Sequence, residues 1–341
     1  MTADNAMSGD GLVVEGLTVE YPTAAGQVLG ADSVSLRVRP GERLGLVGES
    51  GSGKTTTALA ILRMTRPPGR IAAGRVLLDG TDLRALDGDA LRRSRLRLGS
   101  YIPQGAMNSL NPVLTVAAQL RDALADHGGP RGGSRNRRVA DALVAEALAG
   151  VDLPPRAAGL FPHELSGGMK QRVCIAIGML LRPQLIIADE PTSALDVVTQ
   201  RQVMGTLGRR QAETGSCLIL IGHDMGLMAQ FVDRLAVMYA GRVVEAGPVA
   251  AMFRAPRHPY TRLLIDSVPR FERRGEFVGI PGTAPSLARL PPGCAFAPRC
   301  RHAMDVCRRV RPEVEDTEPG RVLACHLGAP RPETDAHAAA D

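Results

Sequence analysis

The sequence contains few aromatic residues and no tryptophan. Phenylalanine and tyrosine together make up only 3% of its 341 residues, so we do not expect single-stranded nucleic acid to stack on exposed rings. The net charge of +6 is too small to make nucleic acid the default partner. No apolar run approaches the roughly 20 residues of a membrane-spanning helix. Residues 1–16 lack the pattern of a secretory signal, so we expect a cytoplasmic chain that does not bind nucleic acid.

Lysine is also scarce, since Lys54 and Lys170 are the only lysines among 41 basic residues. Arginine and lysine serve almost equally well on a solvated surface. A lysine in so arginine-rich a chain can be retained by chance. It can also mark a site that needs a compact ammonium group, where a planar guanidinium does not fit.

Short strands and helices alternate along the first 250 residues. Alternating apolar residues predict half-buried strands at residues 12–20 and 34–38. Short apolar runs at residues 43–47, 185–189 and 217–222 are typical of buried parallel strands. Between them we expect helices over residues 55–64 and 139–149 and an exposed loop over residues 128–138. This alternation predicts an α/β sheet covered on both faces.

The composition changes near residue 250. Residues 254–332 are rich in proline, glycine and arginine, and they contain four of the six cysteines. We expect a separate C-terminal extension over residues 251–332 and a disordered tail over residues 333–341.

A glycine-rich turn follows the expected strand at residues 43–47. Its sequence GESGSGKT, residues 48–55, matches the P-loop pattern G-x-x-x-x-G-K-[ST] between a strand and a helix. The backbone of such a loop wraps phosphate oxygens, the lysine reaches the β- and γ-phosphates, and the last hydroxyl binds Mg²⁺. The expected ATP-binding residues are Gly48, Ser50, Gly51, Ser52, Gly53, Lys54, Thr55 and Thr56.

Two acidic residues follow the apolar run at residues 185–188. In a P-loop protein, a carboxylate at this position is placed to hold Mg²⁺, which we expect of Asp189. The adjacent Glu190 points elsewhere and can orient or deprotonate an attacking water.

The octapeptide LSGGMKQR, residues 165–172, lies between these motifs. This order resembles the ATP-binding cassette (ABC) ATPases. The resemblance implies a P-loop nucleotide-binding domain over residues 1–250, with a RecA-like mixed sheet and a helical subdomain over about residues 105–180. Gln104 resembles the Q-loop glutamine, Asp196 the D-loop aspartate and His223 the switch histidine. Tyr21 is similar to the aromatic residue that stacks on adenine.

In the family, two cassettes close over ATP, and the resemblance assigns roles accordingly. Glu190 polarises the water, His223 contacts the γ-phosphate, and Gln104 helps Thr55 and Asp189 place Mg²⁺ and the water. The signature of the facing cassette contributes Ser166, Gly167, Gly168 and Gln171. Simpler interpretations also exist: Ser166 as a helix N-cap, His223 as a structural histidine, and Tyr21 as a strand-end aromatic residue.

Two segments resemble the peptide/nickel importer branch: NSLNP at residues 108–112 and HPYTRLL at residues 258–264. The branch implies an ATPase at the cytoplasmic face of the membrane, two permease subunits and an extracytoplasmic peptide-binding protein. Met169, where many signatures have glutamine, resembles the first of two unlike ATPases, so we expect a heterodimer. A nickel or other small-solute importer, a non-transport ABC ATPase and a redox-responsive adaptor are the alternatives.

Four cysteines lie inside the expected extension, at Cys294, Cys300, Cys307 and Cys325. Disulfides are disfavoured in the cytoplasm, and the spacings do not fit structural zinc well. Reduced structural cysteines are an alternative to a [4Fe–4S] cluster, which the resemblance to some dipeptide importers implies. Six arginines between residues 289 and 311 would offset the charge of such a cluster. We expect Cys174 and Cys217 to pack in the core.

Overall fold

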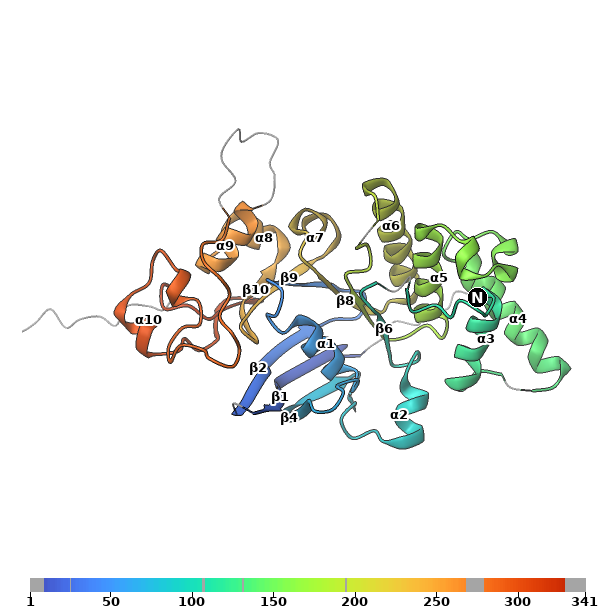
Figure 1. Ribbon diagram of the computed structural model, residues 1–341, viewed down its shortest axis with the longest axis horizontal. Helices are drawn as coiled ribbons and strands as arrows, with labels where there is room; N and C mark the ends of the chain where they lie inside the picture. The colour runs from blue at the N-terminus through green and yellow to red at the C-terminus, as the bar shows by residue number, and fades with distance from the viewer. Residues whose placement is uncertain are drawn as a thin grey trace, which may run out of the picture.

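Figure 1 shows the computed structural model of the chain. It describes residues 9–24, 26–105, 108–130, 132–193, 195–267 and 279–328. The expected tail at residues 333–341 lies outside these ranges. Within them, no helix is both long enough and apolar enough to cross a membrane.

The main sheet has eight strands in the order β11-β12-β10-β9-β3-β8-β7-β6. The strands from β9 to β6 are parallel, and those from β9 to β11 pair antiparallel. Every residue of β7 and β8 is buried, which confirms the buried parallel strands predicted there. The strands are β3 (Arg43–Val47), β6 (Gly99–Ile102), β7 (Leu185–Asp189), β8 (Cys217–Gly222), β9 (Arg234–Tyr239), β10 (Arg242–Pro248), β11 (Glu315–Glu318) and β12 (Arg321–Leu323).

A second, antiparallel sheet has the order β2-β1-β4-β5. Its strands are β1 (Leu12–Thr23), β2 (Gly26–Val38), β4 (Arg70–Leu78) and β5 (Thr81–Asp82). Helix α1 (Lys54–Ile61) lies between the two sheets in Figure 1. Leu17 of β1, Ile61 of α1 and Ile187 of β7 belong to one buried cluster. The smaller sheet and α1 therefore cover one face of the main sheet.

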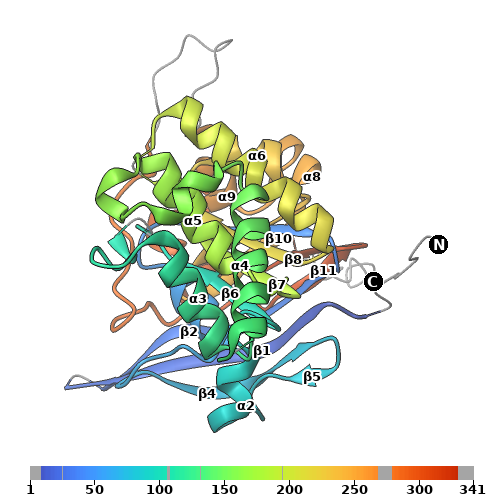
Figure 2. The same ribbon diagram turned by 90° about the vertical axis from the view of Figure 1, so that its right-hand side faces the viewer.

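Helices cover the opposite face of the main sheet (Figure 2). They are α5 (Gly167–Met179), α6 (Val197–Thr214), α7 (Met225–Phe231), α8 (Val249–Arg254) and α9 (Pro259–Asp266). Helices α3 (Val116–Asp126) and α4 (Ser134–Ala149) lie beyond α5, with 3₁₀ turns at Pro155–Gly159 and Pro162–Glu164, and α2 (Gly88–Ser94) lies near β4. The sheet thus has an apolar layer on each side, as the sequence predicts.

The expected loop at residues 128–138 is partly helical, because α4 begins at Ser134. The exposure expected of this segment is confirmed at Arg135, Arg137 and Arg138, which are exposed near the start of the helix. The helix is stabilised further along, where Val144 and Leu148 are buried in the same cluster as Leu120 of α3. Tertiary packing therefore extends the helix into a segment whose own composition is typical of loops.

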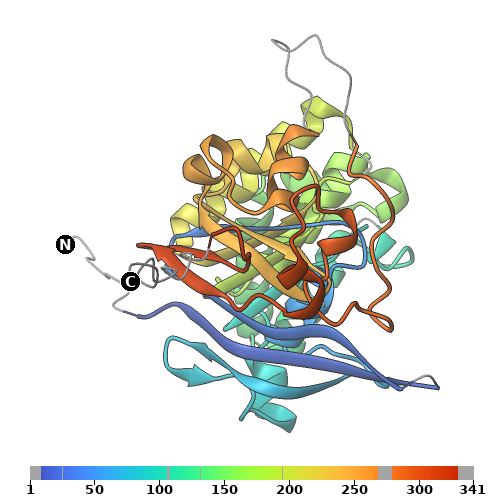
Figure 3. The same cartoon turned by 90° about the vertical axis from the view of Figure 1, so that its left-hand side faces the viewer.

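The C-terminal extension is joined to the cassette through the main sheet. Glu245 and Ala246 of β10 lie opposite Leu323 and Val322 of β12, so the last strands continue the sheet instead of forming one of their own. Figure 3 shows this red segment beside the strands of the cassette. Two short elements complete it, a 3₁₀ turn at Ala297–Arg299 and α10 at Asp305–Arg309.

Candidate functional site

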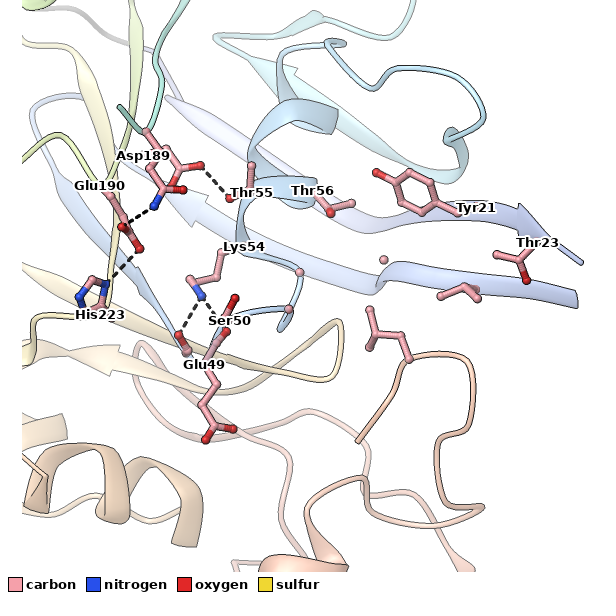
Figure 4. Close-up of a pocket in the computed structure, with 17 residues that line it drawn as sticks. Tyr21, Thr23, Glu49, Ser50, Lys54, Thr55, Thr56, Asp189, Glu190 and His223 are labelled. Atoms are coloured by element: carbon pink, nitrogen blue, oxygen red, sulfur yellow. Dashed lines mark hydrogen bonds and ion pairs between the residues drawn. The ribbon is translucent and has the colours of Figure 1, made fainter. Parts of the chain in front are cut away.

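Three neighbouring parallel strands end at one edge of the main sheet. The glycine-rich loop follows β3, Asp189 ends β7, and His223 follows β8, which lies between β3 and β7. Ligands of open α/β sheets bind at such carboxyl edges. A cavity of about 470 Å³ opens here (Figure 4). It is lined by every P-loop residue that the sequence predicted except Ser52, and by Tyr21, Gln104, Asp189, Glu190 and His223.

The loop after β3 needs glycine at two positions. Gly48 has a φ of 151° and Gly53 a φ of 98°, conformations that other residues rarely adopt. A Cβ at Gly48 would lie 2.2 Å from the carbonyl oxygen of Met238, and a Cβ at Gly53 would lie 2.3 Å from that of Gly30. The loop therefore packs its backbone against β9 and β2.

Lys54 is folded back over this loop. Its Nζ donates hydrogen bonds to the carbonyl oxygens of Gly48 at 2.8 Å and Glu49 at 2.9 Å. Burial lowers the pKa of Lys54, while the nearby Glu190 and Asp189 act in the opposite direction. Its ammonium group thus lies at the cavity wall, between two carbonyl oxygens of the loop.

Oxygen atoms from two motifs meet near Lys54. Thr55 Oγ1 donates to Asp189 Oδ2 at 2.7 Å, and the hydroxyl of Tyr101 donates to the same oxygen at 3.0 Å. Burial, followed by the charge of Asp189, raises the pKa of Tyr101, so its hydroxyl stays protonated. A hydroxyl and a carboxylate beside a phosphate site are the hard oxygen ligands that Mg²⁺ prefers, and the residues present fit that ion.

The carboxylate of Glu190 contacts the side chains of Gln104 and His223. Gln104 Nε2 donates to Glu190 Oε2 at 2.8 Å, and His223 Nδ1 lies 3.0 Å from Glu190 Oε1. The side chain of His223 is 75% exposed, which rules out a buried structural histidine. The three side chains line the cavity together, and the carboxylate is fixed where it can accept a proton from a bound water.

Tyr21 forms the far wall of the cavity on β1. Its ring packs closely against two glycines, since a Cβ at Gly30 would lie 2.8 Å and a Cβ at Gly69 2.5 Å from ring carbons. The ring is therefore held in place by backbone, with one surface facing the cavity (Figure 4).

The signature residues lie away from this cavity, since none of the described residues from 165 to 172 lines it. Ser166 caps α5 by accepting a hydrogen bond from the N–H of Met169 at 3.3 Å, so the N-cap interpretation is correct. Ser166 and Gly167 are also exposed and free to face another molecule. Gln171 is only 3% exposed, which does not fit the nucleotide contact expected of it.

Gly168 and Asp196 join the signature to α6. A Cβ at Gly168 would lie 2.5 Å from Cγ2 of Thr199, so glycine permits a close approach of α5 and α6. Asp196 caps α6 through hydrogen bonds from the hydroxyl of Thr199 at 2.6 Å and its N–H at 3.0 Å. These bonds lower the pKa of Asp196, which remains exposed.

The sequence analysis missed five residues that line the cavity: Thr23, Val28, Gly30, Glu49 and Leu287. Glu49 occupies an unspecified position of the loop pattern, and Leu287 comes from the C-terminal extension. Arg299 of the extension pairs with Glu49, and Arg311 pairs with Asp32. Two of the six arginines expected to offset a metal cluster therefore neutralise carboxylates of the cassette instead. No sequence signal connects residues this far apart.

The structure does not support the iron–sulfur prediction. In the described ranges, no group of three or more histidine, cysteine, aspartate or glutamate side chains is close enough to bind a metal ion. The extension's cysteines do lie near one another. Burial raises the pKa of Cys325 to about 11, with smaller contributions from Cys294, Cys300 and Cys307. Cys174 and Cys217 are buried in the core, which confirms their expected packing role.

Comparison with protein families matches two parts of the chain. Residues 31–193 match the model described as ABC transporter, and residues 244–307 match the oligopeptide/dipeptide transporter C-terminal region. A solved dimeric ATP-binding cassette in a post-hydrolysis state with ADP and Pi is similar in fold. Its TM-score is 0.60 at 27% identity, over 70% of this chain and 98% of that one.

Relatives match along most of both chains. A Brucella ovis ATP-binding protein named for peptide import is 44% identical over 88% of this chain and 92% of its own length. The oligopeptide transport ATP-binding protein OppD of Salmonella typhimurium is 41% identical over 92% of each chain. With the site geometry, these matches show that the chain belongs to the ABC transporter ATPase family, in the branch that carries the oligopeptide/dipeptide transporter C-terminal region.

Proposed function

We propose that the chain is the ATP-hydrolysing subunit of an importer for dipeptides or oligopeptides. One observation carries this proposal: a full set of nucleotide-site residues and the oligopeptide/dipeptide transporter C-terminal region occur in the same chain. The names of the relatives matched over both regions agree with it. In this proposal, residues 1–250 form the nucleotide-binding domain and residues 251–332 an extension.

The proposed reaction is attack of water on the γ-phosphorus of ATP. Glu190 accepts a proton from the water while the water oxygen forms a bond to the γ-phosphorus. The bond between the γ-phosphorus and the leaving oxygen of ADP breaks, which yields ADP and phosphate. Gln104 and His223 hold the two oxygens of Glu190, and His223 also contacts the γ-phosphate. Lys54 and the backbone N–H groups of the loop bind the β- and γ-phosphates.

Thr55, Gln104 and Asp189 would hold Mg²⁺. When bound, the ion neutralises charge that develops on the phosphate oxygens. The hydrogen bond between Thr55 and Asp189 supports this assignment, because it already brings a hydroxyl and a carboxylate together at the cavity. Tyr101 keeps that carboxylate oriented.

A second cassette would complete the site. Ser166, Gly167 and Gly168 are proposed to contact ATP held by the facing ATPase, with Asp196 at the seam between the two. Their distance from this chain's own cavity and the exposure of Ser166 and Gly167 support a contact in trans. The partner is proposed to be a second, unlike ATPase.

The remaining proposed partners are two permease subunits and an extracytoplasmic peptide-binding protein. The ATPase would lie at the cytoplasmic face of the membrane, where residues 108–112 meet a permease. Co-purification of the tagged chain from membranes tests this, with ATPase activity measured with and without peptide and binding protein. We expect permease bands and peptide-stimulated hydrolysis. A chain isolated without a permease, or with hydrolysis stimulated by nickel and not by peptide, would contradict the peptide importer.

The [4Fe–4S] cluster is a separate and finer proposal. The four thiols lie in one part of the extension, but the described residues include no group of three or more side chains that could hold a metal ion. Iron and acid-labile sulfide should be measured in anaerobically purified protein. Four irons per chain would establish the cluster, whereas no iron with four titratable thiols would leave reduced structural cysteines.

A further inference from the structure

The C-terminal extension reaches the phosphate-binding loop through one ion pair. Arg299 donates two hydrogen bonds to the carboxylate of Glu49, one at 2.6 Å and one at 2.9 Å. The two residues are 250 positions apart in the chain. Bidentate pairs of this kind fix both distance and orientation, so the pair ties the loop to the extension rigidly.

Glu49 is held from two further directions. Its backbone N–H donates to the hydroxyl of Tyr260 on α9 at 2.7 Å. Its carbonyl oxygen accepts from Nζ of Lys54 at 2.9 Å. The lysine that faces the phosphates and the arginine of the extension therefore share a single loop residue, and the position of Glu49 affects where Lys54 can lie.

Arg299 is itself built into a rigid setting. Its side chain is only 6% exposed, and it also donates to the carbonyl oxygen of Pro281 at 2.7 Å and the hydroxyl of Tyr239 at 3.2 Å. Its guanidinium lies 5.9 Å from the ring centres of both Tyr239 and Phe296. A side chain held in this way is pre-organised and loses little entropy on pairing.

The pair also removes a charge conflict. Glu49 lines the cavity that receives the nucleotide, and its side chain is 27% exposed. A lone carboxylate at this position would repel a polyphosphate, and the partial exclusion of water would strengthen that repulsion. Arg299 cancels this charge without occupying the phosphate position.

We propose that Arg299 is a positioning residue of the nucleotide site, which neutralises Glu49 and holds the phosphate-binding loop in shape for a nucleoside triphosphate. This inference rests on the proposed ATPase function. The extension is then part of the nucleotide site, to which it also contributes Leu287 at the cavity wall. Arg299 touches no reacting atom, so its loss affects nucleotide affinity more than turnover.

The test compares Arg299→Gln, Glu49→Gln and the double variant in the full chain, by ATPase kinetics and by fluorescence titration with a fluorescent ATP analogue. We expect Arg299→Gln to raise KM and Kd at least about fivefold and to change kcat less than about twofold. Glu49→Gln should bind nucleotide at least as well as the unaltered protein, because it removes the repelling charge while its amide oxygen can still accept a hydrogen bond from Arg299. The double variant should recover most of the lost affinity.

Arg311→Gln is the matched control. Arg311 NH1 also joins the extension to the cassette, through Asp32 Oδ2 at 2.6 Å, and neither residue lines the nucleotide cavity. Its KM should stay within twofold of the unaltered protein. Equal losses in Arg299→Gln and Arg311→Gln would overturn the proposal, since both would then act through general loosening of the extension.

Two other outcomes would also count against it. An unchanged KM in Arg299→Gln would show that the pair does not affect the site. If that variant fails to fold, Glu49→Gln alone decides the question: a fivefold loss of affinity there would show that the charge of Glu49 does not repel the nucleotide, which contradicts the proposed neutralisation. Failure of the unaltered protein to bind nucleotide would instead contradict the proposed function.

Discussion

The hydroxyl of Thr55 donates a hydrogen bond to the carboxylate of Asp189 at 2.7 Å. The two residues lie 134 positions apart. Thr55 belongs to the P-loop pattern, and Asp189 is the carboxylate at the end of an apolar strand. Parallel strands bring their carboxyl ends together at one edge of a sheet. The contact therefore joins the phosphate-binding loop after β3 to the end of β7, at the place proposed for Mg²⁺.

Thr55→Val should weaken the binding of Mg²⁺ that supports ATPase activity. The substitution keeps the shape of the side chain and removes the hydroxyl, so the Mg²⁺ concentration for half-maximal ATPase activity should rise about tenfold, as for loss of one good ligand interaction. Magnesium titrations of activity measure this. Tyr101→Phe is the control, because it removes the other donor to Asp189. Equal shifts in both variants would mean that Thr55 only orients the carboxylate.

Glu190→Gln should abolish turnover and leave nucleotide affinity nearly unchanged. The amide can keep one hydrogen bond within the cavity and cannot accept a proton from water, so kcat should fall at least about a hundredfold. Single-turnover kinetics and nucleotide titration measure the two effects separately. Glu213→Gln, at an exposed carboxylate that pairs with Arg210, should have normal turnover. Normal turnover in Glu190→Gln would remove it as the general base.

Lys54→Arg should behave almost as poorly as Lys54→Ala. Lys54 is only 8% exposed, and its ammonium group fits between two carbonyl oxygens. A planar guanidinium is larger and cannot replace it in that space. We expect both variants to lose nucleotide affinity by more than about tenfold. Lys170→Arg is the matched control, because Lys170 is partly exposed. Full affinity in Lys54→Arg would show that charge alone suffices.

Arg321→Met should destabilise the junction between cassette and extension. Arg321 donates to the fully buried Glu245 at 2.7 Å, and its removal leaves a buried charge without its cation, which costs about 3–5 kcal/mol in the free energy of unfolding. Chemical denaturation measures this, and Glu245→Gln in the same chain should restore part of it. Arg121→Met, at an exposed pair with Asp141, should cost less than about 1 kcal/mol.

The protein should lose stability below pH 6.5 through His258. Burial lowers the pKa of His258 to about 4, although Glu245 opposes the shift. The unfolded chain therefore takes up a proton between pH 6.5 and 4 that the folded chain does not, so this contribution is complete above pH 6.5 and declines as the pH falls towards 4.

The expected size is on the order of 3 kcal/mol over that interval. His258→Asn, which can still accept the hydrogen bond from the N–H of Tyr260, should flatten the pH dependence of unfolding in urea over the same range. An unchanged slope in that variant would assign the effect to other groups.

Contiguous motifs were the part of the site that the sequence could predict. Lys54, Asp189 and Glu190 each lie within a short pattern whose chemistry is readable, and their meeting follows from parallel strand order. The Glu49–Arg299 pair could not be foreseen, because it joins residues that lie 250 positions apart in the chain. The burial of Gln171 could not be predicted either, because a sequence motif does not indicate which face of its helix is buried.

The fold was predicted best at β7 and β8. These strands are buried on both faces, so their sequences are continuous apolar runs that are easy to recognise. It was predicted less well where packing decides, as at Ser134, which begins α4 inside an arginine-rich segment. The attachment of the extension was also hidden, because β12 is only three residues long, Arg321–Leu323. So short a strand carries no periodicity of its own.

Tyr239, Tyr260 and Phe296 pack as a trio, with ring centres 4.6 to 5.4 Å apart. The chain has only four tyrosines and six phenylalanines, so three of its ten phenolic and phenyl rings lie in this one cluster. The boundary proposed at residue 250 separates the first ring from the other two. A shortened protein ending near residue 250 would present Tyr239 to water with its companions gone. Engineered hybrids that exchange extensions between relatives must therefore exchange this ring set as a unit.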